Sequence, residues 1–232
     1  MKIKFSFIHN SNQHKACIIG KNTDVLPEFI FIHGAGTGTK ERIHTFSDVL
    51  EDNGVTMLAF DQSGAGNDIQ NLKQSSLEKR VTETIHAITE FASKEPLVVC
   101  GSSMGGEVAL RMLEQFPVKT LILFCPAIYT PDAFSVKFGE GFTDVIRREE
   151  SWKESITLRY LEKYTGKLLI VIGEEDTVIP EDVIELLDHH SPNVAQKEIY
   201  RIPGCPHVYQ PWLNEHPYEL EKLGETLLKF IR

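Results

Sequence analysis

The feature that most constrains the fold of this chain is a series of short apolar runs that alternate with longer segments of helical periodicity. An apolar run without polar alternation is typical of a strand buried on both faces, as in a parallel sheet. The runs are Phe29–His33, Met57–Asp61, Leu97–Gly101, Leu121–Cys125, Leu168–Gly173 and Ile199–Ile202. The helical segments are Glu41–Asp52, Leu77–Ser93, Gly105–Gln115, Glu181–Asp188 and Pro217–Ile231. This alternation predicts an α/β fold, in which a mostly parallel central sheet is covered by helices on both faces.

Two segments depart from this pattern. Lys2–His9 alternates apolar and polar residues, Asn10-Ser11-Asn12 has the composition of a turn, and Ala16–Gly20 is the expected partner strand of an antiparallel hairpin. The stretch from Tyr129 to Tyr164 is a mixed helical insertion between two strands. Because the chain has no internal repeat, low-complexity tract or linker, we expect one domain over residues 1–232, with the insertion at about residues 129–164.

The composition limits the classes of partner and cofactor. A formal net charge of −9 disfavours nucleic acid, whose binding depends on clustered Lys and Arg. No apolar run approaches the roughly 20 residues of a membrane span, so we expect a cytoplasmic protein without stable membrane insertion. The cysteines are far apart in the sequence, which indicates reduced thiols and neither a metal site nor a cofactor. They are Cys17, Cys100, Cys125 and Cys205.

The turn after the run Leu97–Gly101 contains a candidate nucleophile. Its sequence is Gly101-Ser102-Ser103-Met104-Gly105, and the pattern G-x-S-x-G fits in one register only, which selects Ser103. A serine between a strand and a helix, flanked by glycines, has the context of a nucleophile elbow. The alternative is an ordinary packing turn, so the assignment depends on whether the chain also supplies a base and an acid.

A serine hydroxyl needs a general base, and the base needs an acid that orients it. In this architecture both are expected after later strands, in the order acid and then histidine. Asp176 follows the run Leu168–Gly173, and His207 lies on a loop after Ile199–Ile202, so we expect these two to be the acid and the base. The chain also offers alternatives nearby: the acids Glu174 and Glu175, and the histidines His189, His190 and His216.

A candidate oxyanion hole lies after the first central run, at His33-Gly34-Ala35-Gly36. Glycines there let the backbone approach a bound carbonyl group. The backbone N–H groups of Ala35 and Met104 are then the expected donors to the developing negative charge.

These motifs, in this order, resemble those of the α/β-hydrolase superfamily from about Phe29 to the C-terminus. The resemblance implies an α/β-hydrolase fold with a short helical lid, Ser103 as nucleophile, His207 as base and then acid, and Asp176 as its orienter. It also implies that Ala35 and Met104 form the oxyanion hole. The turn Asp61–Gly66 looks like the superfamily's Asp-x-Arg-Gly-x-Gly, but Ser63 stands where arginine is frequent.

The resemblance implies hydrolysis of a small or medium acyl ester through an acyl-enzyme, with a small-molecule acyl substrate as the partner. A thioesterase or acyltransferase with the same triad is the closest alternative, hydrolysis of a C–C bond is another, and a non-catalytic hydrolase-like binding protein is the alternative of another class. Phe138 and Phe142, around Gly139-Glu140-Gly141, are expected to line an apolar acyl pocket, unless they only pack the insertion against the sheet. The oligomeric state stays open.

Overall fold

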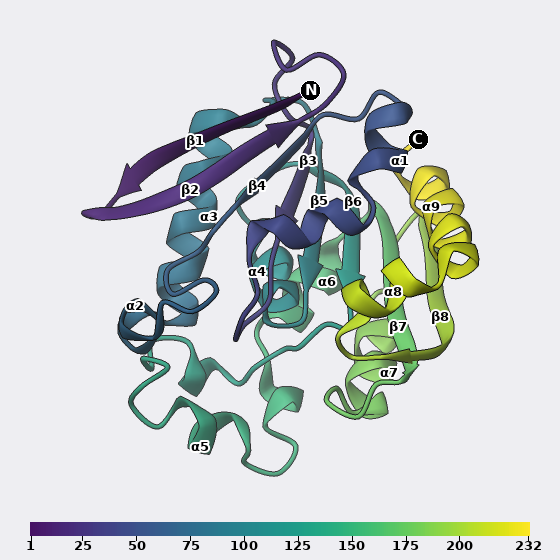
Figure 1. Ribbon diagram of the computed structural model, residues 1–232. Coiled ribbons are helices and arrows are strands. Elements are labelled where there is room, and N and C mark those ends of the chain that lie inside the picture. Colours follow the sequence, from purple (N-terminus) through teal and green to yellow (C-terminus); the bar gives the residue numbers. More distant parts are fainter.

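The computed structural model describes residues 1–232 and contains a sheet in the order β1-β2-β4-β3-β5-β6-β7-β8 (Figure 1). The strands are β1 (Lys2–His9), β2 (Asn12–Ile19), β3 (Phe29–Ile32), β4 (Met57–Phe60), β5 (Leu97–Ser102), β6 (Val118–Phe124), β7 (Lys167–Glu175) and β8 (Gln196–Pro206). All neighbours from β4 to β8 pair in parallel, whereas β1, β2 and β4 pair antiparallel. The predicted hairpin and the mostly parallel sheet are both confirmed.

The helices cover both faces of the sheet. They are α1 (Ser47–Asp52), α2 (Ile69–Gln74), α3 (Leu77–Phe91), α4 (Met104–Met112), α5 (Phe142–Ile146), α6 (Thr157–Lys163), α7 (Glu181–His189), α8 (Tyr209–Glu215) and α9 (Pro217–Ile231). On one face, side chains of α1, α8 and α9 pack in a cluster with alternate residues of the strands, such as Phe29 and Phe31. On the other face, α3, α4, α6 and α7 pack against residues such as Ile30 and Ile32. Strands buried on both sides therefore explain the continuous apolar runs.

The helix predicted over Glu41–Asp52 is divided in the structure. A 3₁₀ helix, η1 (Lys40–Thr45), precedes α1, and Phe46 lies between them with φ −131°. The Phe46 ring is buried and stacks on Phe124, with ring centroids 5.6 Å apart. This anchoring in the core interrupts the helical backbone at Phe46. Two short helices, α2 and α8, were not predicted, because each is too short for a full amphipathic repeat.

The insertion, which we call the cap segment (residues 129–164), contains η2 (Pro131–Ala133), α5, η3 (Ser151–Glu154) and α6. Its last helix belongs to the helical layer, because Leu158 and Leu161 pack in the core. Its earlier part, which includes α5, lies beyond the carboxyl ends of the parallel strands (Figure 1). None of the helices combines the length and the apolar character needed to cross a membrane.

Candidate active site

Ser103 lies on a sharp turn between β5 and α4. Its backbone has φ 51° and ψ −120°, a conformation that L-residues rarely adopt and that is typical of strained functional turns. The flanking glycines make this turn possible: a Cβ at Gly101 would lie 2.3 Å from the carbonyl oxygen of Gly105, and one at Gly105 would lie 2.3 Å from that of Ile32. The turn is fixed by the Ser103 N–H, which donates to the Phe124 carbonyl oxygen at 2.8 Å.

The structure brings Asp176 and His207 to this serine from two neighbouring strand ends. His207 follows the last residue of β8, and Asp176 follows the last residue of β7. His207 Nε2 lies 3.1 Å from Ser103 Oγ, and His207 Nδ1 lies 2.8 Å from Asp176 Oδ2. The three side chains form one continuous hydrogen-bonded chain, as the sequence motifs predict.

The surroundings of Asp176 keep its carboxylate charged. Burial alone would raise the pKa of Asp176, but hydrogen bonds from His207 and from the N–H groups of Val178 and Ile179 outweigh it and hold the pKa below its ordinary value. The Asp176 side chain is 5% exposed and that of His207 is 16% exposed. Since a carboxylate only accepts hydrogen bonds, His207 Nδ1 is the donor, and its Nε2 is free to accept the Ser103 proton.

The competing residues lie outside this hydrogen-bonded chain. Glu174 and Glu175 are exposed at the end of β7. His190 Nδ1 contacts the Glu162 carboxylate at 2.8 Å, and His216 Nδ1 lies 2.7 Å from the Trp212 carbonyl oxygen. Two further residues also take no part in it. His189 ends α7 and packs edge-to-face on His190, and Ser102 is buried as the last residue of β5.

Two backbone N–H groups, one on the residue after Ser103 and one on the neighbouring loop, donate no hydrogen bond within the protein. Met104 is the first residue of α4, so its N–H has no intrahelical acceptor, and the Ala35 N–H donates to no group of the protein. The loop that carries Ala35 lies against the nucleophile, because a Cβ at Gly34 would be 3.1 Å from Ser103 Cβ and 3.7 Å from Ser103 Oγ. Neither N–H group has an acceptor within the protein, and the oxyanion hole expected at Ala35 and Met104 stays a prediction.

The loop is held by His33, a fully buried side chain at the end of β3. Its Nδ1 donates to the Gly34 carbonyl oxygen at 2.7 Å, and its Nε2 accepts from the Gln62 N–H at 3.0 Å. Only the neutral ring can make both bonds, because a proton on Nε2 would face another donor. Burial, together with the nearby Arg80 charge, lowers the pKa of His33 to about 3. His33 is therefore neutral at physiological pH.

Ser103 opens into an apolar pocket with a volume of about 430 Å³. Hydrophobic side chains from the cap segment and from the loop before α7 form most of its wall, and no acidic side chain contributes. The lining residues are Ser103, Ala127, Ile128, Tyr129, Ile146, Arg147, Trp152, Val178, Ile179, Pro180 and Val183. The run Val178-Ile179-Pro180, directly after Asp176, is the sequence signal that could have identified one wall in advance.

Phe138 and Phe142 do not line this pocket, so the expectation that they do is corrected. Phe142 is buried with Leu77, Met104 and Ala133, and Phe138 packs against this cluster. The two rings meet edge-to-face, with centroids 4.8 Å apart. They fill the space between the cap segment and the start of α3, whereas two other aromatic residues of the insertion, Tyr129 and Trp152, line the pocket.

One cluster has side chains of the kinds that bind metal ions, and it overlaps the serine–histidine–aspartate group. Potential ligand atoms of Cys125, Asp176 and His207 lie within 4.8 Å of one another. Burial raises the pKa of the Cys125 thiol, which stays protonated at neutral pH. Asp176 and His207 are already hydrogen-bonded to each other, so this geometry accounts for their proximity without a metal.

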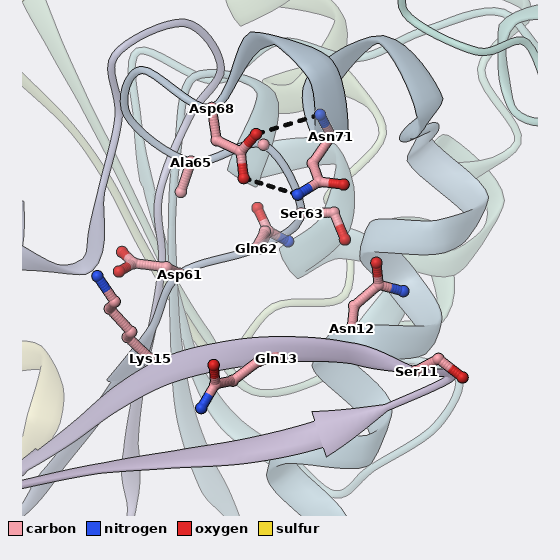
Figure 2. Close-up of a pocket in the computed structure, with 11 residues that line it drawn as sticks. Ser11, Asn12, Gln13, Lys15, Asp61, Gln62, Ser63, Ala65, Asp68 and Asn71 are labelled. Atoms are coloured by element: carbon pink, nitrogen blue, oxygen red, sulfur yellow. Dashed lines mark hydrogen bonds between the residues drawn. The ribbon is translucent and has the colours of Figure 1, made fainter.

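A second cavity of about 470 Å³ shares no lining residue with the apolar pocket. Figure 2 shows it between the start of β2 and the loop after β4, with Asn71 donating to the Asp68 carboxylate. Its wall is polar and includes Gln13, Lys15 and Asp61. It holds no serine paired with a histidine, because the Ser63 hydroxyl in its wall donates to Glu83.

Comparisons with known proteins agree with this fold. The chain is similar over 98% of its length to Est1E from Butyrivibrio proteoclasticus, solved with ferulic acid bound (TM-score 0.72, 20% identity, 99% of that chain covered). It is similar over 96% of its length to the thioesterase domain from the curacin biosynthetic pathway (TM-score 0.69, 13% identity, 99% of that chain covered). A Mycoplasma pneumoniae protein provisionally named esterase/lipase 2 is 23% identical, with 80% of this chain and 85% of that protein aligned.

The sequence profile of one family, described as serine aminopeptidase, S33, matches residues 27–152, which is more than half of the chain. The matched region contains the Ala35 loop and the Ser103 turn, and the remainder supplies Asp176 and His207 in the same eight-stranded sheet. This protein therefore belongs to the S33 serine aminopeptidase-like family of the α/β-hydrolase superfamily.

Proposed function

We propose that the protein is a serine hydrolase that cleaves a small or medium acyl ester through an acyl-enzyme on Ser103. The observation that carries the proposal is the hydrogen-bonded chain from Ser103 Oγ through His207 to Asp176, which opens into an apolar pocket. The names of two similar proteins, an esterase/lipase and a thioesterase domain, support acyl chemistry.

The first half-reaction forms the acyl-enzyme. Ser103 Oγ attacks the ester carbonyl carbon while His207 Nε2 takes the hydroxyl proton. The N–H groups of Ala35 and Met104 stabilise the negative charge that develops on the carbonyl oxygen. The bond to the alkoxy oxygen then breaks, the leaving alcohol takes the proton from His207, and the acyl group remains on Ser103.

The second half-reaction repeats these steps with water. His207 accepts a proton from the water that attacks the acyl-enzyme, and it returns this proton to Ser103 Oγ when the carboxylic acid leaves. Asp176 keeps His207 in the tautomer with the proton on Nδ1 and stabilises the imidazolium in both halves.

The composition of the pocket favours an ester over a peptide with a free amino terminus. An aminopeptidase has to bind an α-ammonium group, for which a carboxylate is the ordinary partner. The pocket beside Ser103 contains no acidic residue, and its only charged side chain is the cationic Arg147. An apolar wall of this kind suits a hydrocarbon acyl chain, which gains about 0.8 kcal/mol for each methylene removed from water.

A thioester is attacked by the same groups, so it remains the alternative substrate. The non-catalytic alternative is disfavoured by the alignment of all three side chains, since a binding protein does not require a strained serine at hydrogen-bonding distance from an imidazole that a carboxylate orients.

The test uses a fluorophosphonate, which phosphonylates an activated serine. We expect mass spectrometry to find the label on Ser103, and Ser103→Ala to lower kcat by a factor on the order of 10⁶. Ser102→Ala is the matched control and should keep most of the activity. A chain-length series of p-nitrophenyl esters and the matching thioesters then separates the two substrate classes. Labelling of Ser102, or active protein without any label, would refute the proposal.

A further inference from the structure

Arg80 on α3 is a fully buried arginine whose guanidinium group lies at the back of the candidate oxyanion hole. Its Nη1 donates to the Gly34 carbonyl oxygen at 3.3 Å and lies 3.5 Å from the Met104 sulfur. Its Nη2 donates to the Ser63 carbonyl oxygen at 3.5 Å. The guanidinium carbon lies 5.1 Å from the centre of the Phe138 ring. One cation therefore contacts both segments that carry the expected oxyanion donors.

The charge of Arg80 is not neutralised by an ion pair. The nearest acid on its own helix is Glu83, whose buried carboxylate accepts hydrogen bonds from the backbone N–H and the hydroxyl group of Ser63 instead. The Arg80 Nε atom has no hydrogen-bond partner. Burial lowers the pKa of Arg80 to about 10, with Glu83 and Tyr129 opposing the shift, so the side chain stays cationic at neutral pH.

A buried cation without a paired carboxylate is costly, and proteins normally avoid one. The Arg80 guanidinium also lies against the backbone of the turn Asp61–Gly66, because its Nη2 donates to the Ser63 carbonyl oxygen. The positive charge behind the Ala35 loop is thus supplied from α3.

The hydrogen bond from Arg80 to the Gly34 carbonyl oxygen affects the Ala35 N–H, which belongs to the same peptide unit. The Gly34 carbonyl and the Ala35 N–H belong to one planar trans peptide unit, so they point in opposite directions. His33 and Arg80 both donate to the carbonyl oxygen, which fixes the rotation of the whole unit. Because hydrogen bonds in a chain polarise one another, a cation at the carbonyl end makes the N–H at the other end a stronger donor.

We propose that Arg80 is a positioning residue for the oxyanion hole. Arg80 holds and polarises the Gly34–Ala35 peptide unit and adds positive charge behind the oxyanion. The proposal rests on the proposed serine-hydrolase function. The role differs from that of a residue that only fills the core. Arg80 should contribute when negative charge forms on the substrate oxygen, and not when the neutral substrate binds.

The test compares two ketones that carry the same acyl chain. A trifluoromethyl ketone forms a tetrahedral adduct with an active serine and places an oxyanion in the hole, whereas the corresponding methyl ketone binds as a neutral carbonyl compound. In Arg80→Met we expect about a 10- to 30-fold increase in the Ki of the trifluoromethyl ketone, a matching fall in kcat/KM, and less than a twofold change in the Ki of the methyl ketone. Removal of a direct oxyanion donor elsewhere costs about 10²–10³, and an indirect contribution is smaller.

Two further variants keep the test decisive. Arg80→Lys keeps the charge but has one nitrogen in place of the two that donate separately to Gly34 and Ser63, so we expect a loss of about three- to tenfold. This variant carries the test if Arg80→Met does not fold. Arg201→Lys is the control: Arg201 pairs with Glu181 at the surface and donates to neither the Ala35 loop nor the Ser103 turn, so this variant should leave both Ki values unchanged.

The outcomes distinguish the two proposals. If fluorophosphonate does not label Ser103 in the unmodified protein, the proposed function fails, and the role of Arg80 fails with it. If Ser103 is labelled but the Arg80 variants bind the trifluoromethyl ketone as tightly as the unmodified protein, or lose affinity for both ketones equally, only the role of Arg80 is overturned.

Discussion

His33 makes the stability of the folded chain depend on pH in a direction that the structure fixes. Burial and the nearby Arg80 charge lower the pKa of His33 to about 3, and protonation of the folded state would also break the hydrogen bond from the Gln62 N–H. In the unfolded chain a histidine has a pKa of about 6.5. Between these two values the unfolded state binds the additional proton, so the free energy of unfolding falls as the pH is lowered from about 6.5 toward 3.

The size of the effect follows from the same two values. Relative to pH 7.5, proton uptake by the unfolded chain at His33 lowers the free energy of unfolding by roughly 1 to 1.5 kcal/mol at pH 5.5 and by roughly 2.5 to 3 kcal/mol at pH 4.5. Well below pH 6.5, the free energy of unfolding falls by about 1.4 kcal/mol for each pH unit. The total is a large share of the roughly 5–15 kcal/mol of unfolding free energy that is typical of a folded domain.

Urea unfolding followed by tryptophan fluorescence at four pH values between 7.5 and 4.5 measures this dependence. The control is His33→Asn, whose amide can donate to the Gly34 carbonyl oxygen and accept from the Gln62 N–H but does not titrate. His33→Asn is expected to be less stable at pH 7.5 but to lose about 3 kcal/mol less on acidification to pH 4.5. Parallel pH curves for the two proteins would show that His33 is protonated in the folded state and would refute the reasoning.

The remaining predictions concern the proposed site. Asp176→Asn should lower kcat by about 10⁴, because an amide does not hold the imidazole in the required tautomer; a loss below tenfold would contradict the assignment. Trp152→Ala should enlarge the pocket and shift the preferred p-nitrophenyl ester to a longer chain, whereas Phe138→Ala should leave the chain-length profile unchanged. Arg147→Gln should lower kcat/KM about two- to fivefold for an ester whose acyl chain ends in a carboxylate, and not for its neutral analogue. Arg148→Gln is the control, since Arg148 already pairs with Asp132.

The sheet and the order of the three side chains were predictable because local patterns carry them. Continuous apolar runs occur where strands are covered on both faces. Glycine at 101 is required by a contact within the turn itself, and glycine at 105 by the close approach of the end of β3. His207 was predictable for a similar reason, since a strand end places the following residue at the edge of the sheet. The interruption at Phe46 was not predictable, because the Phe46 ring packs against Phe29, Phe31 and Phe124, which only the folded core brings together.

The pocket walls were less predictable, because they depend on how the cap segment folds back over the sheet. Phe138 and Trp152 are both aromatic residues in the same insertion, and composition does not distinguish them. Their places differ because Phe138 packs over the buried Arg80 guanidinium, whereas Trp152 packs toward α7 and the pocket. The neighbours that separate these two rings come from α3 and α7, far from the insertion in the sequence.

The attachment of the cap segment depends on a buried acid that no motif identifies. Glu107 lies one turn into α4, the helix that begins directly after Ser103, and burial raises the pKa of its carboxyl group although Arg111 is paired with it. Its Oε2 accepts from the Tyr129 N–H at 3.3 Å and from the Ser155 hydroxyl at 3.4 Å. Tyr129 lines the pocket, so one carboxylate ties the pocket wall to the helix that carries the nucleophile. Because a partly satisfied buried acid is costly, these donors specify one position of the cap segment relative to Ser103, which a purely apolar contact would leave free to slide.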